Sequence, residues 1–284
     1  MNLKVLFVGK GIITTELYGL LKPMSQYDPW IYRRNASNEV DFKITHHIKQ
    51  ALDNTAMIIS CVPDDNASEF FWKNQDVINY CNNKQPVCIE MSTLSYNYAR
   101  KLHEYFTEIK CRFVEMPFTG SKQGAHTGKL SLFLKSNFEL STEIKSFLNV
   151  ISIKKYVFHE EGKPTLFKLF YNIWGFSYLY FLSEFGPIIK ECFQNEDNVI
   201  EILKTDGWMS GVCRGKLDSF LIDNYSDTSF SLNHAIKDID YALDIFSKFE
   251  MPVTRNIAKM YHLVLNSENG NSDFSTICEI YQRK

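Results

Sequence analysis

Residues 4–14 read Lys-Val-Leu-Phe-Val-Gly-Lys-Gly-Ile-Ile-Thr, an apolar run that ends in two closely spaced glycines. The run predicts a β-strand, and the next segment, Ile12–Leu21, has helical spacing. Gly9 would permit a tight turn between the two elements, and Gly11 would let a phosphate approach the backbone at the start of the helix. Because Thr14 stands where the Gly-x-Gly-x-x-Gly pattern has its third glycine, the stretch alone indicates dinucleotide binding only weakly.

Strand-like and helix-like segments alternate through the first half of the chain. Helical patterns occupy 67–82 and 96–110, among others. Strands are expected at 4–8, 30–33, 57–62, 87–91, 112–115, 130–134 and 156–158. This alternation implies βαβ units and a mainly parallel sheet, so we expect a Rossmann-type α/β domain over residues 1–162.

The pattern changes after Gly162. From there to residue 284, apolar residues recur at helical spacing and no convincing strand follows. Breakers such as Gly186-Pro187 and the glycines between 211 and 215 suggest a long first helix followed by four to six more. We therefore expect an all-helical domain over residues 163–284 that opens with a long interdomain helix.

The composition excludes several classes of protein. The 284 residues carry 31 Lys plus Arg against 33 Asp plus Glu, and 45% are hydrophobic, so the chain is neither disordered nor broadly basic. We expect no nucleic-acid partner and no membrane span, because the most apolar stretch, 166–182, contains Lys168. The seven cysteines lack metal-ligand spacing and the N-terminus lacks a signal-peptide pattern. These features favour free thiols, no metal site and a cytoplasmic location.

The second expected strand ends in basic residues. Residues 31–37 read Ile-Tyr-Arg-Arg-Asn-Ala-Ser, with Arg33 and Arg34 where an NAD-selective site usually has an acid. Paired arginines fit a 2′-phosphate through bidentate hydrogen bonds and through stacking on adenine. The alternative is a solvated basic loop. We favour NADP(H) over NAD as the cofactor.

A second glycine cluster lies in residues 112–130, which read RFVEMPFTGSKQGAHTGKL. This segment resembles the F-V-E-x-P-V-S-G-S/G-x-x-G-A-x-x-G-x-L motif of the β-hydroxyacid dehydrogenases, which include 3-hydroxyisobutyrate and 6-phosphogluconate dehydrogenases. Residues 90–93, 168–172 and 230–238 are similar to three further family motifs, D-x-S-T, K-x-x-x-N and F-x-L-x-H-x-x-K-D. The motifs occur in the family's order, and the last two are most similar to the glyoxylate/succinic-semialdehyde reductase branch.

The resemblance gives Lys168 and Asn172 catalytic roles. Reduction of a carbonyl group by a nicotinamide needs a proton donor, and a lysine on an apolar helix is a candidate because burial lowers the pKa of an ammonium group. The alternative to a catalytic role is a structural lysine whose charged end reaches solvent. Asn172 lies one helical turn beyond Lys168, where its amide can bond to Lys168 or to the substrate, unless it is a packing residue.

The remaining site residues follow from the same resemblance. Thr119, Gly120 and Ser121 would hold a substrate carboxylate with hydroxyl and N–H donors, with an ordinary β-turn as the alternative. Asp238, just after Lys237, would be a structural partner and not a reacting group. Residues expected to contact the cofactor are Gly9, Lys10, Gly11, Ile12, Ile13, Thr14, Arg33, Arg34, Val62, Pro63, Thr93 and Lys237. Phe118, Trp208 and Phe230 are expected to sense the rest of the substrate.

The sequence therefore predicts an NADPH-dependent oxidoreductase that reduces a small carboxylate-bearing aldehyde or keto acid, or oxidises the matching hydroxy acid. Two alternatives remain, an imine reductase on the same fold and a non-catalytic dinucleotide-binding protein. Imine reductases generally lack the lysine, so Lys168 counts against the first alternative. The very apolar helix over 167–185 also predicts a homodimer or homotetramer in which it is buried.

Overall fold

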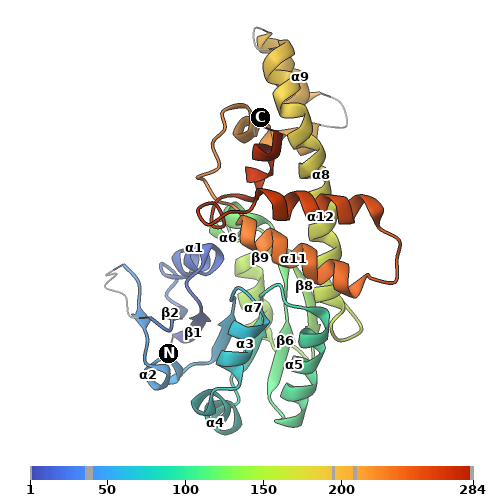
Figure 1. The fold of residues 1–284 in the computed structure, drawn as a ribbon. Coiled ribbons are helices and arrows are strands. Elements are labelled where there is room, and N and C mark those ends of the chain that lie inside the picture. Colours follow the sequence, from blue (N-terminus) through green and yellow to red (C-terminus); the bar gives the residue numbers. More distant parts are fainter. Residues whose placement is uncertain (1, 36–40, 194–195, 207–209, 282–284) are drawn as a thin grey trace. The chain divides into compact units, whose positions relative to one another are not determined.

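The computed structural model describes residues 2–35, 41–193, 196–206 and 210–281. The chain divides into two compact units, Met1–Lys168 and Leu169–Lys284. Figure 1 shows that strands occur in the N-terminal part and helices follow it.

The first unit is built on a nine-stranded sheet among the described residues. Its strands are β1 (Leu3–Val8), β2 (Tyr27–Tyr32), β3 (Ile44–Thr45), β4 (Met57–Ser60), β5 (Val87–Glu90), β6 (Arg112–Glu115), β7 (Phe118–Thr119), β8 (Leu130–Ser136) and β9 (Ser152–Val157). The order is β3-β2-β1-β4-β5-β6-β8-β7, with β9 beside β8, and neighbouring strands from β3 to β6 are parallel. The parallel part has the strand order of the doubly wound dinucleotide-binding fold, which confirms the expected fold class.

Both faces of this sheet are covered. The helices of the unit are α1 (Ile12–Leu21), α2 (Ile48–Leu52), α3 (Asp65–Trp72), α4 (Gln75–Lys84), α5 (Tyr96–Glu108), α6 (Ser121–His126) and α7 (Thr142–Ile151). Phe7 of β1 belongs to one core with Phe147 of α7, whereas Leu6 belongs to a second core with Trp72 and Phe106. Burial on both faces explains why the first strand is an unbroken apolar run.

Three expected element boundaries in this unit were wrong. β2 begins at Tyr27 and includes Pro29, because among the described residues β3 pairs with β2 only from Ile31 onward and does not need an N–H from Pro29. The single helix expected over 67–82 is two helices, with Asn74 capping the second by accepting a hydrogen bond from the Asp76 N–H at 2.9 Å. The strand expected near 156–158 is β9, Ser152–Val157.

The second unit is helical, as expected. Its helices are α8 (Lys163–Phe193), which begins in the first unit, α9 (Asp197–Thr205), α10 (Ser210–Leu221), α11 (Leu232–Ile245), α12 (Pro252–Val264) and a 3₁₀ helix η1 (Phe274–Tyr281). Leu169 and Phe176 of α8 share a core with Phe220 and Tyr261. None of the helices in the described part of the chain is long and apolar enough to cross a membrane.

Two of the expected breakers do not interrupt the helices of this unit. α8 continues through Gly186-Pro187 to Phe193, and α10 continues through the glycines at 211 and 215. Proline has no N–H to donate to the carbonyl four residues earlier, here that of Ser183. That carbonyl accepts a hydrogen bond from the Cys278 thiol at 3.5 Å, which satisfies the group that Pro187 leaves without a helical donor.

Candidate functional site

The carboxyl ends of the parallel strands bring the expected cofactor residues of the first unit to one edge. Val8 is the register partner of both Tyr32 and Ser60, and Ser60 is the partner of Glu90. The segments that follow these strands, beginning at Gly9, Arg33, Cys61 and Met91, therefore start level with one another. Ligands of doubly wound folds bind at this edge of the sheet.

The glycine loop leads from β1 into α1. Gly9 has a φ of +91°, and a Cβ on it would lie 2.8 Å from the carbonyl oxygen of Cys61, so a larger residue would not fit there. Gly11 caps α1, and no heavy atom lies within 4 Å of where its Cβ would be. Lys10 places its ammonium group 5.0 Å from the centre of the Phe42 ring, and in the first turn of α1 Ile12 is exposed and Ile13 half-buried. The open helix start is compatible with a pyrophosphate group.

Thr14 has a structural reason to replace the third glycine. Its hydroxyl accepts a hydrogen bond from the Gly11 N–H at 2.9 Å and donates one to the Gly11 carbonyl at 3.1 Å. The side chain is fully buried, so it has no surface to offer to a cofactor. Thr14 holds the conformation of Gly11 instead, because its one hydroxyl bonds to both backbone groups of Gly11.

Arg33 and Arg34 follow directly after β2. The Arg33 N–H donates to the carbonyl of Thr45 at 3.1 Å, which fixes the backbone there. The Arg34 guanidinium lies 5.2 Å from the centre of the Phe70 ring on α3, and Phe70 is half exposed. Positive charge and an exposed aromatic ring thus lie together at the strand end. Ala36 and Ser37, also quoted for this strand end, are outside the described residues.

The segments after β4 and β5 are joined by hydrogen bonds that the sequence did not reveal. The Val62 N–H donates to the Ser92 hydroxyl at 2.8 Å, and the Ser92 N–H donates to the carboxylate of Glu90 at 3.0 Å. Burial raises the pKa of Glu90, whose carboxylate also accepts from Ser68 and Trp72. These bonds hold together the two segments that contain Val62, Pro63 and Thr93. The sequence marks this network only by Glu90, the acid of the D-x-S-T-like motif at residues 90–93.

The expected substrate segment lies beside Lys168. Gly120 has a φ of +128° and Ser121 a φ of +53°, so the chain turns sharply between β7 and α6. Lys168 is 8% exposed, and its Nζ lies 5.8 Å from the centre of the Phe118 ring. The side chain of Lys168 is therefore packed at the residue just before Thr119, which places it next to the segment proposed to bind the carboxylate. All of these residues belong to the first unit.

In the second unit a buried carboxylate joins two expected site residues. The Asn172 amide donates to Asp238 Oδ2 at 2.5 Å, and the Lys237 Nζ lies 2.9 Å from Asp238 Oδ1. Asp238 is fully buried, and Lys237 also lies 5.3 Å from the centre of the Tyr241 ring. The sequence suggested Lys168 or the substrate as the partner of Asn172; the structure gives its amide to Asp238, which is 66 residues away. Trp208, expected near the substrate, is outside the described residues.

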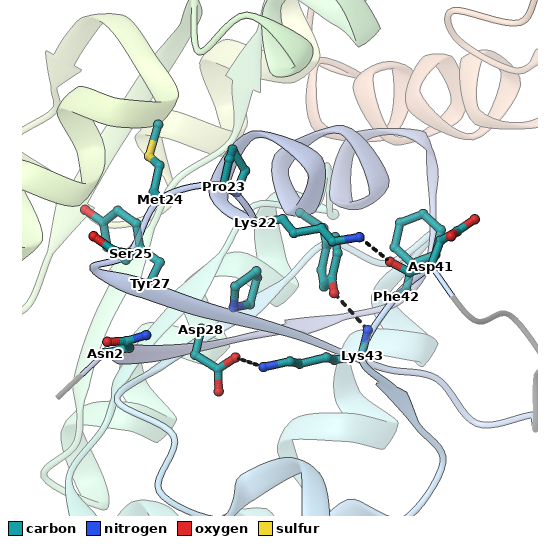
Figure 2. A pocket seen from close by; sticks show the side chains of 12 residues that line it. Asn2, Lys22, Pro23, Met24, Ser25, Tyr27, Asp28, Asp41, Phe42 and Lys43 are labelled. Atoms are coloured by element: carbon teal, nitrogen blue, oxygen red, sulfur yellow. Dashed lines mark hydrogen bonds and ion pairs between the residues drawn. The ribbon is translucent and has the colours of Figure 1, made fainter.

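A hollow of about 360 Å³ lies elsewhere in the first unit, at the C-terminal end of α1 and the start of β2 (Figure 2). The Lys43 ammonium pairs with Asp28 at 2.5 Å, and the Lys43 N–H donates to the Tyr18 hydroxyl at 2.8 Å. None of the expected site residues lines this hollow. Among the described side chains, no group of three or more His, Cys, Asp or Glu could hold a metal ion.

Two family models match the chain. A model described as the NAD binding domain of 6-phosphogluconate dehydrogenase matches residues 25–159, and one described as the NAD-binding of NADP-dependent 3-hydroxyisobutyrate dehydrogenase matches residues 162–281. Together they cover most of the chain. The first match begins beyond the glycine loop in which Thr14 departs from the usual pattern.

Individual proteins resemble this chain only at low sequence identity, between 13% and 26% for four of them. Glyoxylate/succinic semialdehyde reductase 1 of Arabidopsis thaliana is 26% identical over 193 residues, which are 67% of this chain and 66% of that protein. Among solved structures, Psf3 in complex with NADP+ and 2-OPP has a TM-score of 0.83 at 20% identity, covering 98% of this chain and 99% of its own. A 3-hydroxyisobutyrate dehydrogenase from Salmonella typhimurium has a TM-score of 0.80 at 14% identity, covering 98% and 100%. An imine reductase from Myxococcus stipitatus has a TM-score of 0.56 at 13% identity, covering 99% and 100%.

The strand order, the glycine loop at the carboxyl edge and the helical second unit define a dinucleotide-binding protein of the doubly wound α/β class. The two family models identify a particular family, which the fold alone does not. The chain belongs to the 3-hydroxyisobutyrate dehydrogenase family, whose members are NAD(P)-dependent hydroxyacid dehydrogenases that act on CH–OH groups. The resemblance stated from the sequence motifs is thereby confirmed.

Proposed function

We propose that this protein is an NADPH-dependent oxidoreductase that reduces a small carboxylate-bearing aldehyde or keto acid, or oxidises the matching hydroxy acid. One observation carries the proposal, the nearly complete burial of Lys168 against Phe118, next to Thr119, Gly120 and Ser121. A lysine held inside a protein beside hydroxyl and backbone donors has the surroundings of a proton-transfer group and not of a solvated surface charge. The names of the relatives support a substrate of the semialdehyde or glyoxylate kind.

The proposed roles follow from the chemistry of the side chains. A bound nicotinamide cofactor supplies the hydride that the carbonyl carbon receives. Lys168 donates the proton to the carbonyl oxygen, and it accepts that proton back when a hydroxy acid is oxidised. The hydroxyl groups of Thr119 and Ser121, with the Gly120 N–H, bind the substrate carboxylate. Asn172 orients the reacting group, while Asp238 holds the Asn172 amide in place.

The first unit has groups that fit NADP(H). Gly9, where a Cβ would collide with the Cys61 carbonyl, permits the tight turn after β1, and the open position at Gly11 leaves room for a pyrophosphate to approach the start of α1. Arg33 and Arg34, with the exposed Phe70 ring, provide positive charge and a stacking surface for an adenosine 2′-phosphate. The other residues proposed to contact the cofactor are Lys10, Gly11, Ile12, Ile13, Val62, Pro63, Thr93 and Lys237, with Thr14 acting through Gly11.

A substrate screen tests the proposal. The full-length protein would be incubated with succinic semialdehyde, glyoxylate and other short carboxylate-bearing aldehydes, with NADPH or NADH, and cofactor oxidation followed at 340 nm. We expect turnover of at least one of these aldehydes and a preference for NADPH. A cyclic imine and an aldehyde without a carboxylate serve as comparison substrates. Turnover of the imine alone would show an imine reductase, and tight NADPH binding without any turnover would show a non-catalytic binding protein.

We also propose that the active form is a cytoplasmic homodimer or homotetramer, with the domains at residues 1–162 and 163–284. An exposed apolar stripe runs along α8 at spacings of three and four residues, and its members are each between 44% and 54% exposed. They are Phe170, Trp174, Tyr178, Phe181, Phe185 and Ile188. A stripe of this kind is typical of an interface, because burying each large side chain contributes about 1.5–3 kcal/mol.

Placing charges on this stripe is expected to dissociate the assembly. The double change Trp174→Glu and Phe181→Glu would put two carboxylates into the proposed interface, where they would lose their water without gaining partners. Light scattering at micromolar concentration should then report a monomer, where the unaltered protein is a dimer or larger. Phe249→Glu is the matched control, because Phe249 is 53% exposed but is not on α8. A monomeric unaltered protein would contradict this proposal.

A further inference from the structure

The start of α8 is held by a residue from another element. The first four N–H groups of a helix lack partners within the helix, and Gly162, just before Lys163, has no side chain that could accept from them. The carboxylate of Glu115, the last residue of β6, accepts hydrogen bonds from two of these N–H groups. Its Oε2 accepts from the Gly162 N–H and its Oε1 from the Thr165 N–H, both at 2.9 Å. Two of the backbone groups at the start of α8 are thus bonded to one buried side chain.

Glu115 is itself firmly placed. It is 2% exposed, and His103 of α5 has its Nε2 2.8 Å from Glu115 Oε2. His103 is fully buried, and its ring packs edge-on against Phe113 of β6 with 4.9 Å between the centroids. The carboxylate therefore has a protein partner for each oxygen and little freedom to change its rotamer.

Gly162 is fitted closely against α5. It has a φ of +76°, and a Cβ there would lie 2.7 Å from the side chain of Arg100 and 2.9 Å from that of Tyr96. A helix whose first turn is bonded to β6 and packed on α5 has little freedom to slide or rotate. Lys168, which lies five residues beyond the start of α8, takes its position from this anchor.

We propose that Glu115, supported by His103, is the positioning residue that sets the distance between Lys168 and the substrate segment. Glu115 is close in sequence to the surroundings of Lys168. It comes only three residues before Phe118, whose ring is the neighbour of the Lys168 ammonium group. The segment from Glu115 to Thr119 thus carries the side chain that anchors the helix of Lys168 and also leads into the proposed substrate segment. This inference rests on the proposed function for the role of Lys168, and on the structure alone for the anchoring of α8.

The variant Glu115→Gln tests the anchor with little change of shape. A glutamine amide presents one acceptor oxygen, so one of the two helix N–H groups must face an N–H₂ donor. Glu115→Asp is the second variant, which keeps the charge but is one methylene too short to reach both groups. Glu90→Gln is the matched control, because Glu90 is equally buried and is the register partner of Glu115 on β5, but bonds to Ser68, Trp72 and Ser92.

Hydrogen exchange measured by mass spectrometry gives a readout that needs no turnover. We expect amides in the peptide 160–170 to exchange about 10-fold faster in both Glu115 variants, since local opening there becomes easier. Acetylation of Lys168 by an N-hydroxysuccinimide ester should also become faster. Both rates should be unchanged in Glu90→Gln. Unchanged exchange and acetylation in folded Glu115→Gln would overturn the proposal, whether or not the protein proves to be an enzyme.

Kinetics separate positioning from stability. In Glu115→Gln we expect kcat to fall by about 10- to 100-fold, because a small misplacement of a reacting group has effects of that size. The Kd for NADPH, measured by fluorescence titration, should change by less than about 3-fold, because β4 and β5 separate β6 from β1 and the glycine loop that follows it. Faster exchange at α8 with an unchanged kcat would show that Glu115 is structural only and would overturn the positioning role. If the unaltered protein turns over no substrate, the proposed function fails, while exchange and acetylation still decide the anchor.

Discussion

Replacing Lys168 with alanine is expected to lower kcat by on the order of 10²- to 10⁴-fold, the range that general acid–base groups contribute. The change removes the only group proposed to transfer the proton to the carbonyl oxygen. NADPH should still bind, because its phosphates are assigned to the glycine loop and the arginines. Steady-state oxidation of NADPH measures kcat, and quenching of intrinsic fluorescence on titration with NADPH measures the Kd.

Lys163→Ala is the matched control for this variant. Lys163 lies on the same helix, its side chain is 41% exposed, and its partner is the exposed Glu160 at 3.6 Å. An exposed pair of this kind contributes little to stability, so this variant should keep the kcat and melting temperature of the unaltered protein. If Lys168→Ala turned over substrate at the normal rate, the assignment of Lys168 as general acid would be wrong.

The double change Arg33→Ala and Arg34→Ala is expected to remove the preference for NADPH. Each hydrogen bond to a charged group contributes roughly 1.5–3 kcal/mol, so the KM for NADPH should rise by at least about 10-fold. The KM for NADH should change by less than about 3-fold, because NADH has no 2′-phosphate for these side chains to bind. The two values of kcat/KM, measured with the same aldehyde, give the cofactor preference directly.

A control for net charge is needed, since losing two positive charges weakens the attraction of any anion. Lys84→Ala with Lys101→Ala removes the same charge from exposed positions on α4 and α5, away from the residues after β2. This variant should keep the preference for NADPH. An equal rise of both KM values in the arginine variant would instead indicate a general effect on the fold of the loop.

Much of the fold could be predicted from local patterns. The run at β1, the glycines after it and the alternation of strands with helices are short-range features, and each predicts its element through backbone sterics and burial. Arg33 and Arg34 could also be predicted as cofactor residues. In this fold the residues that directly follow a parallel strand lie at the edge of the sheet where ligands bind. Family motifs then predicted Lys168 and the segment Thr119–Ser121 as site residues.

Element boundaries depended on neighbours that a local pattern does not include. Pro29 lies inside a strand because the described β3 pairs with β2 only from Ile31 onward, and Pro187 lies inside a helix whose freed carbonyl accepts a hydrogen bond from Cys278. In both cases segments distant in sequence decide the outcome, because the described β3 does not pair at the level of Pro29 and Cys278 supplies the donor that Pro187 lacks.

The sequence by itself determined the class of fold, the order of the elements and the chemical groups available to the site. Only the tertiary structure decided which of these groups are fixed by hydrogen bonds, and which distant residues supply their partners. Glu115 bonds to backbone groups 47 and 50 residues away, and Asp238 bonds to an amide 66 residues away. The physical reason is that a buried carboxylate must find donors wherever the fold brings them, and no periodicity in the sequence records that pairing.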